Sequence, residues 1–191
     1  MASVADSFTS GTGVTSLVGS ITATGGLCTS ATNNSFVIGQ YQGTTLGADQ
    51  FAEMSIVTLD ATTSRRWGVA TRMGTAGQNY QLFLDASGGG SWQLSKYVSF
   101  TETTVSGAQA ITISLPMRIR LESIGSTHRV VINGVPMGAY TDTDVTTGQY
   151  VGIYGLNPNS AVAGDDFYGG DVFPMPPPQP GVSAVMRAAT I

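Results

Sequence analysis

The feature that most constrains the fold is a series of short alternating or apolar runs, separated by turn residues, with almost no helical period. No segment places apolar residues at i, i+3, i+4 and i+7 over three turns, as a surface helix would. The run MRIRLESI, residues 117–124, instead alternates apolar and charged side chains over its first six positions. A side-chain period of two belongs to a β-strand with one buried face. We therefore predict an all-β chain.

The same reading along the chain predicts the individual strands and their connections. The predicted strands are Ser7–Thr9, Leu17–Thr22, Ser35–Gln40, Gln50–Leu59, Trp67–Arg72, Tyr80–Asp85, Ser91–Val98, Glu102–Ser106, Met117–Ile124, His128–Ile132, Val135–Tyr140, Tyr150–Tyr154 and Asp165–Val172. Asn133-Gly134 stands between two apolar runs and is typical of a two-residue hairpin, because both residues tolerate positive φ. Many short strands and 25 glycines favour an antiparallel two-sheet β-sandwich of the jelly-roll type.

The composition changes abruptly at Phe173. The prolines that follow cannot join the interior of a sheet and favour an extended polyproline II conformation. We therefore predict a β-sandwich domain over 1–172 and an extended proline-rich C-terminal arm over 173–191. Such an arm can bind a neighbouring subunit by strand addition or in a groove. The arm residues predicted to make assembly contacts are Pro174, Pro176, Pro177, Pro178, Pro180, Val182, Val185, Met186 and Ile191.

Charge and hydropathy exclude several classes of partner. The formal net charge is −4 with only 8 Lys and Arg residues, whereas binding to nucleic-acid phosphates needs clustered cations. No apolar run approaches the roughly 20 residues that span a bilayer, so we expect no membrane partner. Residues 1–10 lack the basic and apolar regions of a signal peptide, and we expect no secretory signal. The single cysteine, Cys28, excludes an internal disulfide and is predicted to be a small buried hydrophobe.

Residues for catalysis are sparse, and we predict no catalytic site and no cofactor. Glycosidases need two carboxyl groups flanking the scissile bond, but Glu53, Glu102 and Glu122 are isolated in the sequence. Glu122 shares a strand face with two arginines, which predicts a solvated face with charge pairing. The single histidine, His128, is predicted to lie at the surface or in a hairpin. The chain is therefore predicted not to be an enzyme.

Two kinds of binding residue remain as candidates. Asp142 and Asp144 in the TDTD turn are weak calcium candidates, although Asp is also common in turns because it bonds its own backbone. Aromatic rings stack on sugars, and the possible glycan contacts are Trp67, Trp92 and Tyr97, with Tyr80 and Tyr154 as further candidates for an exposed sheet face or rim. Most aromatics of a sandwich lie in the core, so both interpretations of these residues stay open.

The stretch 117–172 resembles the concanavalin A-like lectin/glucanase superfamily in its laminin-G-like form. The resemblance rests on MRIRLES, HRVVINGVPM with its hairpin, GQYVGIYG and the closing DDFYGGDV. It implies that the last strand returns beside the first, with Asp166-Phe167 near Asp6-Ser7-Phe8. The fold hosts lectins, glycosidases and structural modules. A Ser/Thr/Gly-rich β domain with a short arm also resembles decoration and tail proteins of tailed bacteriophages.

Two functional hypotheses follow from these resemblances. The first is a non-catalytic structural protein of the virion, a phage capsid decoration (cement) or tail-associated protein. Its residues 174–191 and Met1–Ser7 would bind major capsid or tail subunits and copies of itself, with many weak contacts summed by avidity. The alternative is a carbohydrate-binding, lectin-like module for receptor recognition, with glycans as partners.

Overall fold

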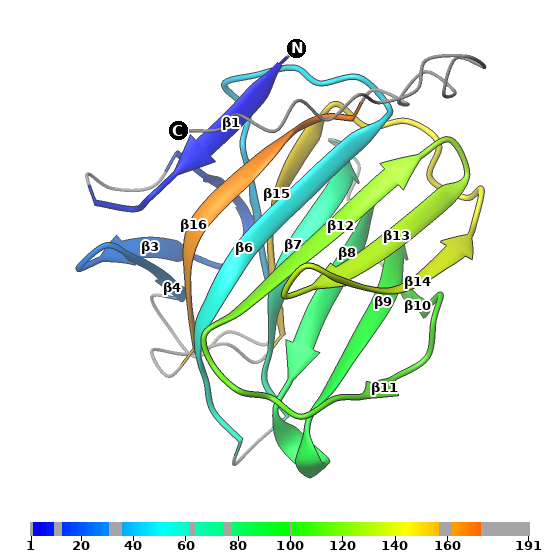
Figure 1. Cartoon of the computed structure of the whole chain (residues 1–191). Coiled ribbons are helices and arrows are strands. Elements are labelled where there is room, and N and C mark those ends of the chain that lie inside the picture. The colour runs from blue at the N-terminus through cyan, green and yellow to red at the C-terminus, as the bar shows by residue number, and fades with distance from the viewer. Residues whose placement is uncertain are drawn as a thin grey trace, which may run out of the picture.

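The chain folds into two curled antiparallel sheets that pack face to face as a β-sandwich (Figure 1). The computed structural model describes residues 2–9, 13–30, 36–61, 64–74, 78–99, 101–156 and 162–172. Among these residues, no helix has the length and apolar character needed to cross a membrane. The two packed antiparallel sheets confirm the prediction of an all-β, two-sheet sandwich.

Within the described ranges, each sheet has eight strands. Sheet A runs in the spatial order β14 (Val135–Thr141), β13 (Thr127–Ile132), β12 (Met117–Ile124), β6 (Gln50–Leu59), β16 (Val162–Asp171), β4 (Leu27–Ser30) and β3 (Ile21–Thr24), with β1 (Ser3–Asp6) also beside β16. Sheet B runs in the order β10 (Thr101–Thr104), β9 (Ser91–Val98), β8 (Asn79–Asp85), β7 (Arg66–Met73), β15 (Tyr150–Leu156), β5 (Phe36–Gln40) and β2 (Thr15–Val18), with β11 (Gln109–Ala110) also beside β9. In Figure 1, strands of sheet A cross in front of those of sheet B.

The hydrophobic core lies between the two sheets. In β12, Met117, Ile119 and Leu121 are buried while the charged residues between them face outward, as the alternation predicts. Burying each such aliphatic side chain stabilises the fold by about 1.5–3 kcal/mol. Cys28 is completely buried in the same core, which confirms its prediction as a small hydrophobe.

The two local features tied to the lectin-like resemblance are both present. β1 pairs with β16, and Asp6 lies opposite Phe167, so the last strand does return beside the first (Figure 1). Asn133 and Gly134 join β13 to β14 with φ values of 50° and 78°. These positive values are those of a type I′ hairpin turn, which confirms the hairpin prediction.

The strand predictions fail mainly in the first 30 residues. Ser7–Thr9 is not a strand, because Phe8 has a φ of 55° and its backbone N–H binds the Asp6 carboxylate in a turn. The predicted strand Leu17–Thr22 is interrupted at Gly19, whose φ is 67°. Its halves belong to β2 of sheet B and β3 of sheet A. The short strands β1, β4 and β11 were not predicted.

The predicted C-terminal arm, 173–191, lies outside the described residues. The division into a domain over 1–172 and an arm therefore stays a prediction. At the other end, residues 3–6 pair with β16 of the same chain. This pairing makes residues 3–6 a strand of their own domain, and contact of the N-terminal segment with a neighbouring subunit stays a prediction.

Candidate binding site on the outer face of sheet B

The outer face of sheet B is the side of its strands that points away from the core. In β8, Tyr80, Leu82 and Leu84 enter the core between the sheets, so Gln81 and Phe83 point outward because side chains alternate along a strand. The outward face of an antiparallel sheet is commonly solvated. Here Gln81 is 0% exposed and Phe83 1% exposed, so this outer face is covered.

Sheet B curls around this outer face. Phe36 on β5 and Tyr97 on β9 have three strands between them in the sheet order. In a flat sheet, four strand spacings of about 4.8 Å would separate them by about 19 Å. Their rings nevertheless stack with centroids 5.0 Å apart. The sheet therefore curves until two half-buried rings meet across its outer face.

Aromatic side chains continue from this stack along the face. The Tyr154 ring contacts the Phe36 ring edge-on, with centroids 5.5 Å apart, and the Phe83 ring at 5.4 Å. The Arg66 guanidinium lies 4.7 Å above the centre of the Phe83 ring. Aromatic pairs of this kind contribute about 0.5–1.5 kcal/mol beyond their buried area. The contacts give the outer face an aromatic lining.

A row of small and uncharged residues crosses the middle of the same face. The strand registers place Ser95, Gln81, Ala70, Gly152 and Gln40 side by side, one from each of five adjacent strands. All five are buried. We call this row the floor of the outer face. The floor is polar, uncharged and shielded from bulk water.

Several buried polar atoms on this face have no hydrogen-bond partner. Within the described residues six buried side-chain atoms lack one, and four of these are Nε2 and Oε1 of Gln81, Oδ1 of Asn79 and Nε of Arg66. The other two are indole nitrogens of Trp67 and Trp92 in the core. An unpaired buried polar atom costs about 1–3 kcal/mol, so native structures keep few of them. Their concentration here fits a surface that pairs with a polar ligand.

The charged groups of this face are paired with one another. The Arg66 guanidinium lies between two carboxylates, with Nε 3.6 Å from Asp85 Oδ2 and Nη1 3.4 Å from Glu102 Oε1. The Tyr154 hydroxyl donates to the second carboxylate oxygen of Glu102 at 3.3 Å. Burial, together with the nearby Glu102 charge, raises the pKa of the Tyr154 phenol well above its usual value. Tyr154 therefore remains a neutral donor.

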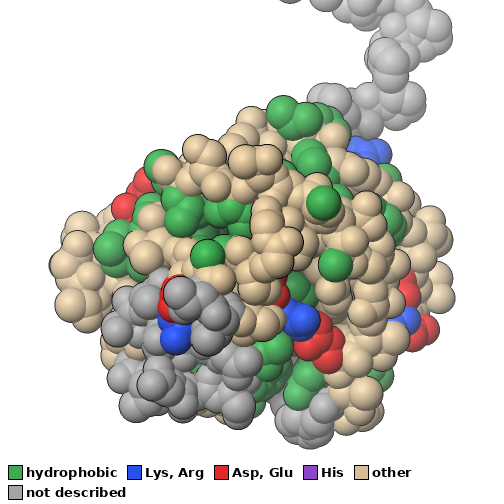
Figure 2. Space-filling view, turned by 90° about the horizontal axis from the view of Figure 1, so that it is seen from below, with side chains coloured by type: hydrophobic (Ala, Val, Ile, Leu, Met, Phe, Trp, Pro, Cys, Tyr) green, Lys and Arg blue, Asp and Glu red, His purple; other side chains and the backbone are tan. Residues whose placement is uncertain are grey.

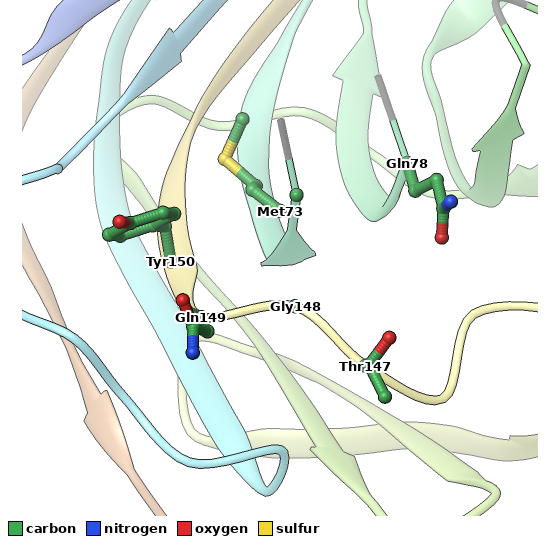
Figure 3. A pocket seen from close by; sticks show the side chains of 7 residues that line it. Met73, Gln78, Thr147, Gly148, Gln149 and Tyr150 are labelled. Carbon is green, nitrogen blue, oxygen red and sulfur yellow. The ribbon is translucent and has the colours of Figure 1, made fainter. Parts of the chain in front are cut away.

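A pocket of about 380 Å³ opens at one end of this face (Figure 3). Met73 and Tyr150 line it and also belong to the apolar cluster of the outer face, which includes Ile38. The polar residue Gln78 lines it as well and immediately precedes Asn79, whose Oδ1 is unpartnered. The pocket therefore adjoins the outer face at the start of β8.

Two of the three predicted glycan contacts lie elsewhere. Trp67 and Trp92 are 0% and 2% exposed and belong to the core cluster between the sheets. Their large apolar rings fill that core, so they present no surface to a sugar, and the prediction is corrected for both. Tyr97 is half-buried on the outer face of sheet B. Tyr97 and the further candidate Tyr154 are the predicted aromatics that the structure brings to this face.

The two calcium candidates, Asp142 and Asp144, form ion pairs with Lys96. Lys96 Nζ lies 2.5 Å from a carboxylate oxygen of Asp142 and 2.5 Å from one of Asp144. Tyr80 donates its hydroxyl proton to Asp142. The ammonium group thus occupies the position between the carboxylates where a cation would bind. In the described part of the chain, no three His, Cys, Asp or Glu residues gather in a way that could hold a metal ion.

His128 lies in the β12–β13 hairpin, one of its two predicted positions, but it is buried rather than at the surface. Its Nδ1 lies 2.9 Å from Ser123 Oγ, its Nε2 lies 3.3 Å from the Asp142 carbonyl oxygen, and its ring packs on Tyr80. Ser123 and His128 are both 0% exposed. A substrate cannot reach this serine and histidine, which act as a hydrogen-bonded part of the core.

The outer face of sheet A is charged and partly solvated, as predicted for Glu122 and its neighbours. Glu53 accepts from Arg118 at 2.6 Å and from Arg120 at 3.3 Å, while Arg120 also binds Glu122 at 2.8 Å. The Arg118 side chain is 43% exposed. In the view from below, most of the few visible Lys and Arg side chains also lie beside an Asp or Glu (Figure 2).

Solved structures share this fold. The carbohydrate binding module CBM66 from Bacillus subtilis has a TM-score of 0.59 and 14% identity, covering 84% of this chain and 94% of that chain. An apo Crh5 transglycosylase has a TM-score of 0.62 and 8% identity, covering 90% and 85%. A mutant of the GH43 protein BlXynB from Bacillus licheniformis has a TM-score of 0.58 and 13% identity, covering 87% of this chain but only 38% of that chain.

These similarities show the fold alone, because the identities are low. This chain therefore shares the β-sandwich fold of the three structures. No protein-family model and no curated protein matches the sequence.

Sequence reasoning missed most of the residues on this face: Phe36, Arg66, Gln81 and Phe83. One signal was present in β8, NYQLFLD, where Phe83 stands on the side opposite Tyr80 and Leu82. A large apolar residue on the expected solvent side indicates that this side is covered too. Nothing comparable marks Gln81, because an outward glutamine is ordinary in a solvated strand.

Proposed function

We propose that this chain is a carbohydrate-binding, lectin-like protein whose glycan binds on the outer face of sheet B. The observation that carries the proposal is the chemistry of that face, where aromatic rings surround a buried, uncharged polar floor with unpartnered amide atoms. Ligand sites commonly combine an aromatic and apolar lining with a few polar groups that fix orientation. Sugars offer matching apolar ring faces and hydroxyl groups.

The fold similarities support this proposal over the alternatives. The CBM66 structure is by its description a carbohydrate binding module, and this chain covers 94% of it. The similar transglycosylase and GH43 structures come from carbohydrate-related proteins as well. Because a jelly roll serves many functions, the fold supports the proposal only together with the outer face of sheet B.

The hypothesis of a phage decoration or tail protein gains no support from these similarities. Its main residues, 174–191, lie outside the described part of the chain, and residues 3–6 pair within their own subunit. Capsid or tail partners therefore have no support. A location in the virion stays an untested prediction.

Hydrolysis of the glycan is not proposed. Asp85 and Glu102 are both near Arg66, and a glycosidase needs two carboxyl groups about 5–9.5 Å apart with the scissile bond between them. Here the Arg66 guanidinium occupies that position. Each carboxylate therefore faces a cation of the protein itself.

A glycan array tests the proposal directly. The wild-type protein should bind a defined set of glycans, and Tyr97→Ala should weaken binding by about tenfold or more because a contacting ring of about 1.4 kcal/mol is lost. Arg118→Ala, on the outer face of sheet A, is the matched control and should bind as wild type does. Thermal melting checks that both variants are folded. Equal loss in both variants, or an array without signal, would refute the proposal.

A further inference from the structure

Gln81 is the polar residue that the fold explains least. Its side chain is 0% exposed, and neither amide atom has a hydrogen-bond partner within the described residues. Gln93 lies on the neighbouring strand β9 and on the same face. Its amide donates to Ser95 Oγ at 2.7 Å and to Thr104 Oγ1 at 3.1 Å. The two glutamines of this face therefore differ in two respects: Gln81 is buried and unpaired within the described residues, whereas Gln93 is half-buried and hydrogen-bonded.

The fold gains nothing from an amide at position 81. Replacing an unpaired buried polar group by an apolar group of similar shape removes a destabilising term. Asn79 stands two residues away on β8 and also faces outward, with its Oδ1 unpartnered and its side chain 1% exposed. At about 3.4 Å per strand residue, the two amides are about 7 Å apart. They form a line that begins beside the pocket at Gln78.

The chemistry of the face selects an uncharged ligand. A side-chain amide both donates and accepts hydrogen bonds, and so does a hydroxyl group. An acidic ligand would need a free cation, but Arg66 is already shared by Asp85 and Glu102. A cationic ligand would have to displace that guanidinium, and burying its charge beside an uncharged floor would be unfavourable.

We propose that the ligand of this face is a neutral glycan and that the Gln81 amide recognises it by hydrogen bonding to adjacent hydroxyl groups. This inference rests on the proposed function, whose site it specifies. Since Gln81 is closed to solvent, the covering side chains must move when the ligand binds. The Phe36–Tyr97 stack is the contact that spans the face, and it has to separate.

The experiment compares two Gln→Leu variants of the full chain. An array with neutral, sulfated and uronic-acid oligosaccharides identifies the preferred class, and calorimetric titration with the best neutral oligosaccharide follows. Gln81→Leu should weaken binding at least about tenfold and should raise Tm, because two unpaired polar atoms are removed. Gln93→Leu, the matched control, should lower Tm because it removes two existing hydrogen bonds. A merely structural glutamine at position 81 would not give this combination of weaker binding and higher Tm.

Each other outcome overturns a definite part of the inference. Binding of acidic glycans alone leaves the proposed function intact but refutes the neutral ligand. Neutral binding that survives Gln81→Leu refutes the role of Gln81. A Gln81→Leu variant with a lower Tm, or one that fails to fold, shows that the amide serves the fold. An array without any signal refutes both this inference and the proposed function.

Discussion

The outer faces of the two sheets obey the same alternation of side chains but differ in almost every other respect. Sheet A presents Arg118 and Glu53 in a ladder of ion pairs, and the arginine is 43% exposed. Sheet B presents Phe83 and Gln81, which are almost fully buried. The ion pairs of sheet A are satisfied by one another and by water. The Gln81 amide of sheet B has no hydrogen-bond partner in the described chain.

The difference teaches that curvature, rather than residue type alone, decides what an outer face can do. A charged face in contact with water contributes little to stability and binds little, because its groups are already solvated or paired. A curled face excludes water, so each polar group on it interacts more strongly with any partner that reaches it. The comparison can be tested by matched substitutions on the two faces.

The largest effect is expected from apolar truncations. Phe83→Ala on sheet B should lower the free energy of unfolding by about 3–5 kcal/mol, as in a core. Val131→Ala, on the outer face of β13 in sheet A, should lower it by about 1 kcal/mol or less. Urea denaturation of both variants measures the difference. Similar small losses would mean that the outer face of sheet B is open, and the contrast would fail.

The next effect concerns pH and belongs to neither outer face. Burial lowers the pKa of His128 to about 4, with the charge of Arg72 adding to the shift and a bond to the Asp142 carbonyl opposing it. Between pH 6.5 and 4 the unfolded chain binds a proton that the folded chain does not. The free energy of unfolding should therefore be constant above pH 6.5 and fall by about 3 kcal/mol on going down to pH 4.

Denaturation at several pH values, for wild type and His128→Gln, checks this expectation. The variant should lose the part of the pH slope that lies between 6.5 and 4, whatever its absolute stability. Identical slopes would show that His128 is not the responsible group.

The smallest effect is expected from arginine truncations. Arg66→Ala on sheet B should cost about 1–3 kcal/mol, because it uncovers Phe83 and leaves two carboxylates without their cation. Arg118→Ala on sheet A should change stability by about 0.5 kcal/mol or less, because Glu53 keeps Arg120 as a partner. Thermal melting of both variants at low and high salt measures the two stability costs. Equal costs would show that the two faces do not differ in how they use their charges.

The sequence predicts the strands of the second half of the chain well, because their signals are local. Alternation defines β12, and Asn133-Gly134 defines the turn between β13 and β14 through backbone preferences alone. Failures occur where a short strand has no strong pattern, as in β4 with its residues LCTS, or where Gly19 divides one apparent strand between two sheets.

The candidate site is much less predictable. Alternation shows that Trp67 and Val69 share one face of a strand, but not which face is covered by the rest of the molecule. The curl that brings Phe36 to Tyr97 arises from twist accumulated over five strands, and no short segment encodes it. For that reason Tyr97 was found by residue type, whereas Gln81 required the structure.

The position of β16 in sheet A has a consequence for how the protein folds during its synthesis. Among the described residues, β1 and the β3–β4 hairpin join sheet A through β16, while β6 carries β12 on its other side. The β3–β4 hairpin can form early, but β1 and this hairpin must wait for the last strand before they can join the sheet. Pairings of such sequence separation form slowly, since the loop must close before the contacts form. Until then the early strands leave the ribosome with open edges, and they are the segments most exposed to misassembly with other chains.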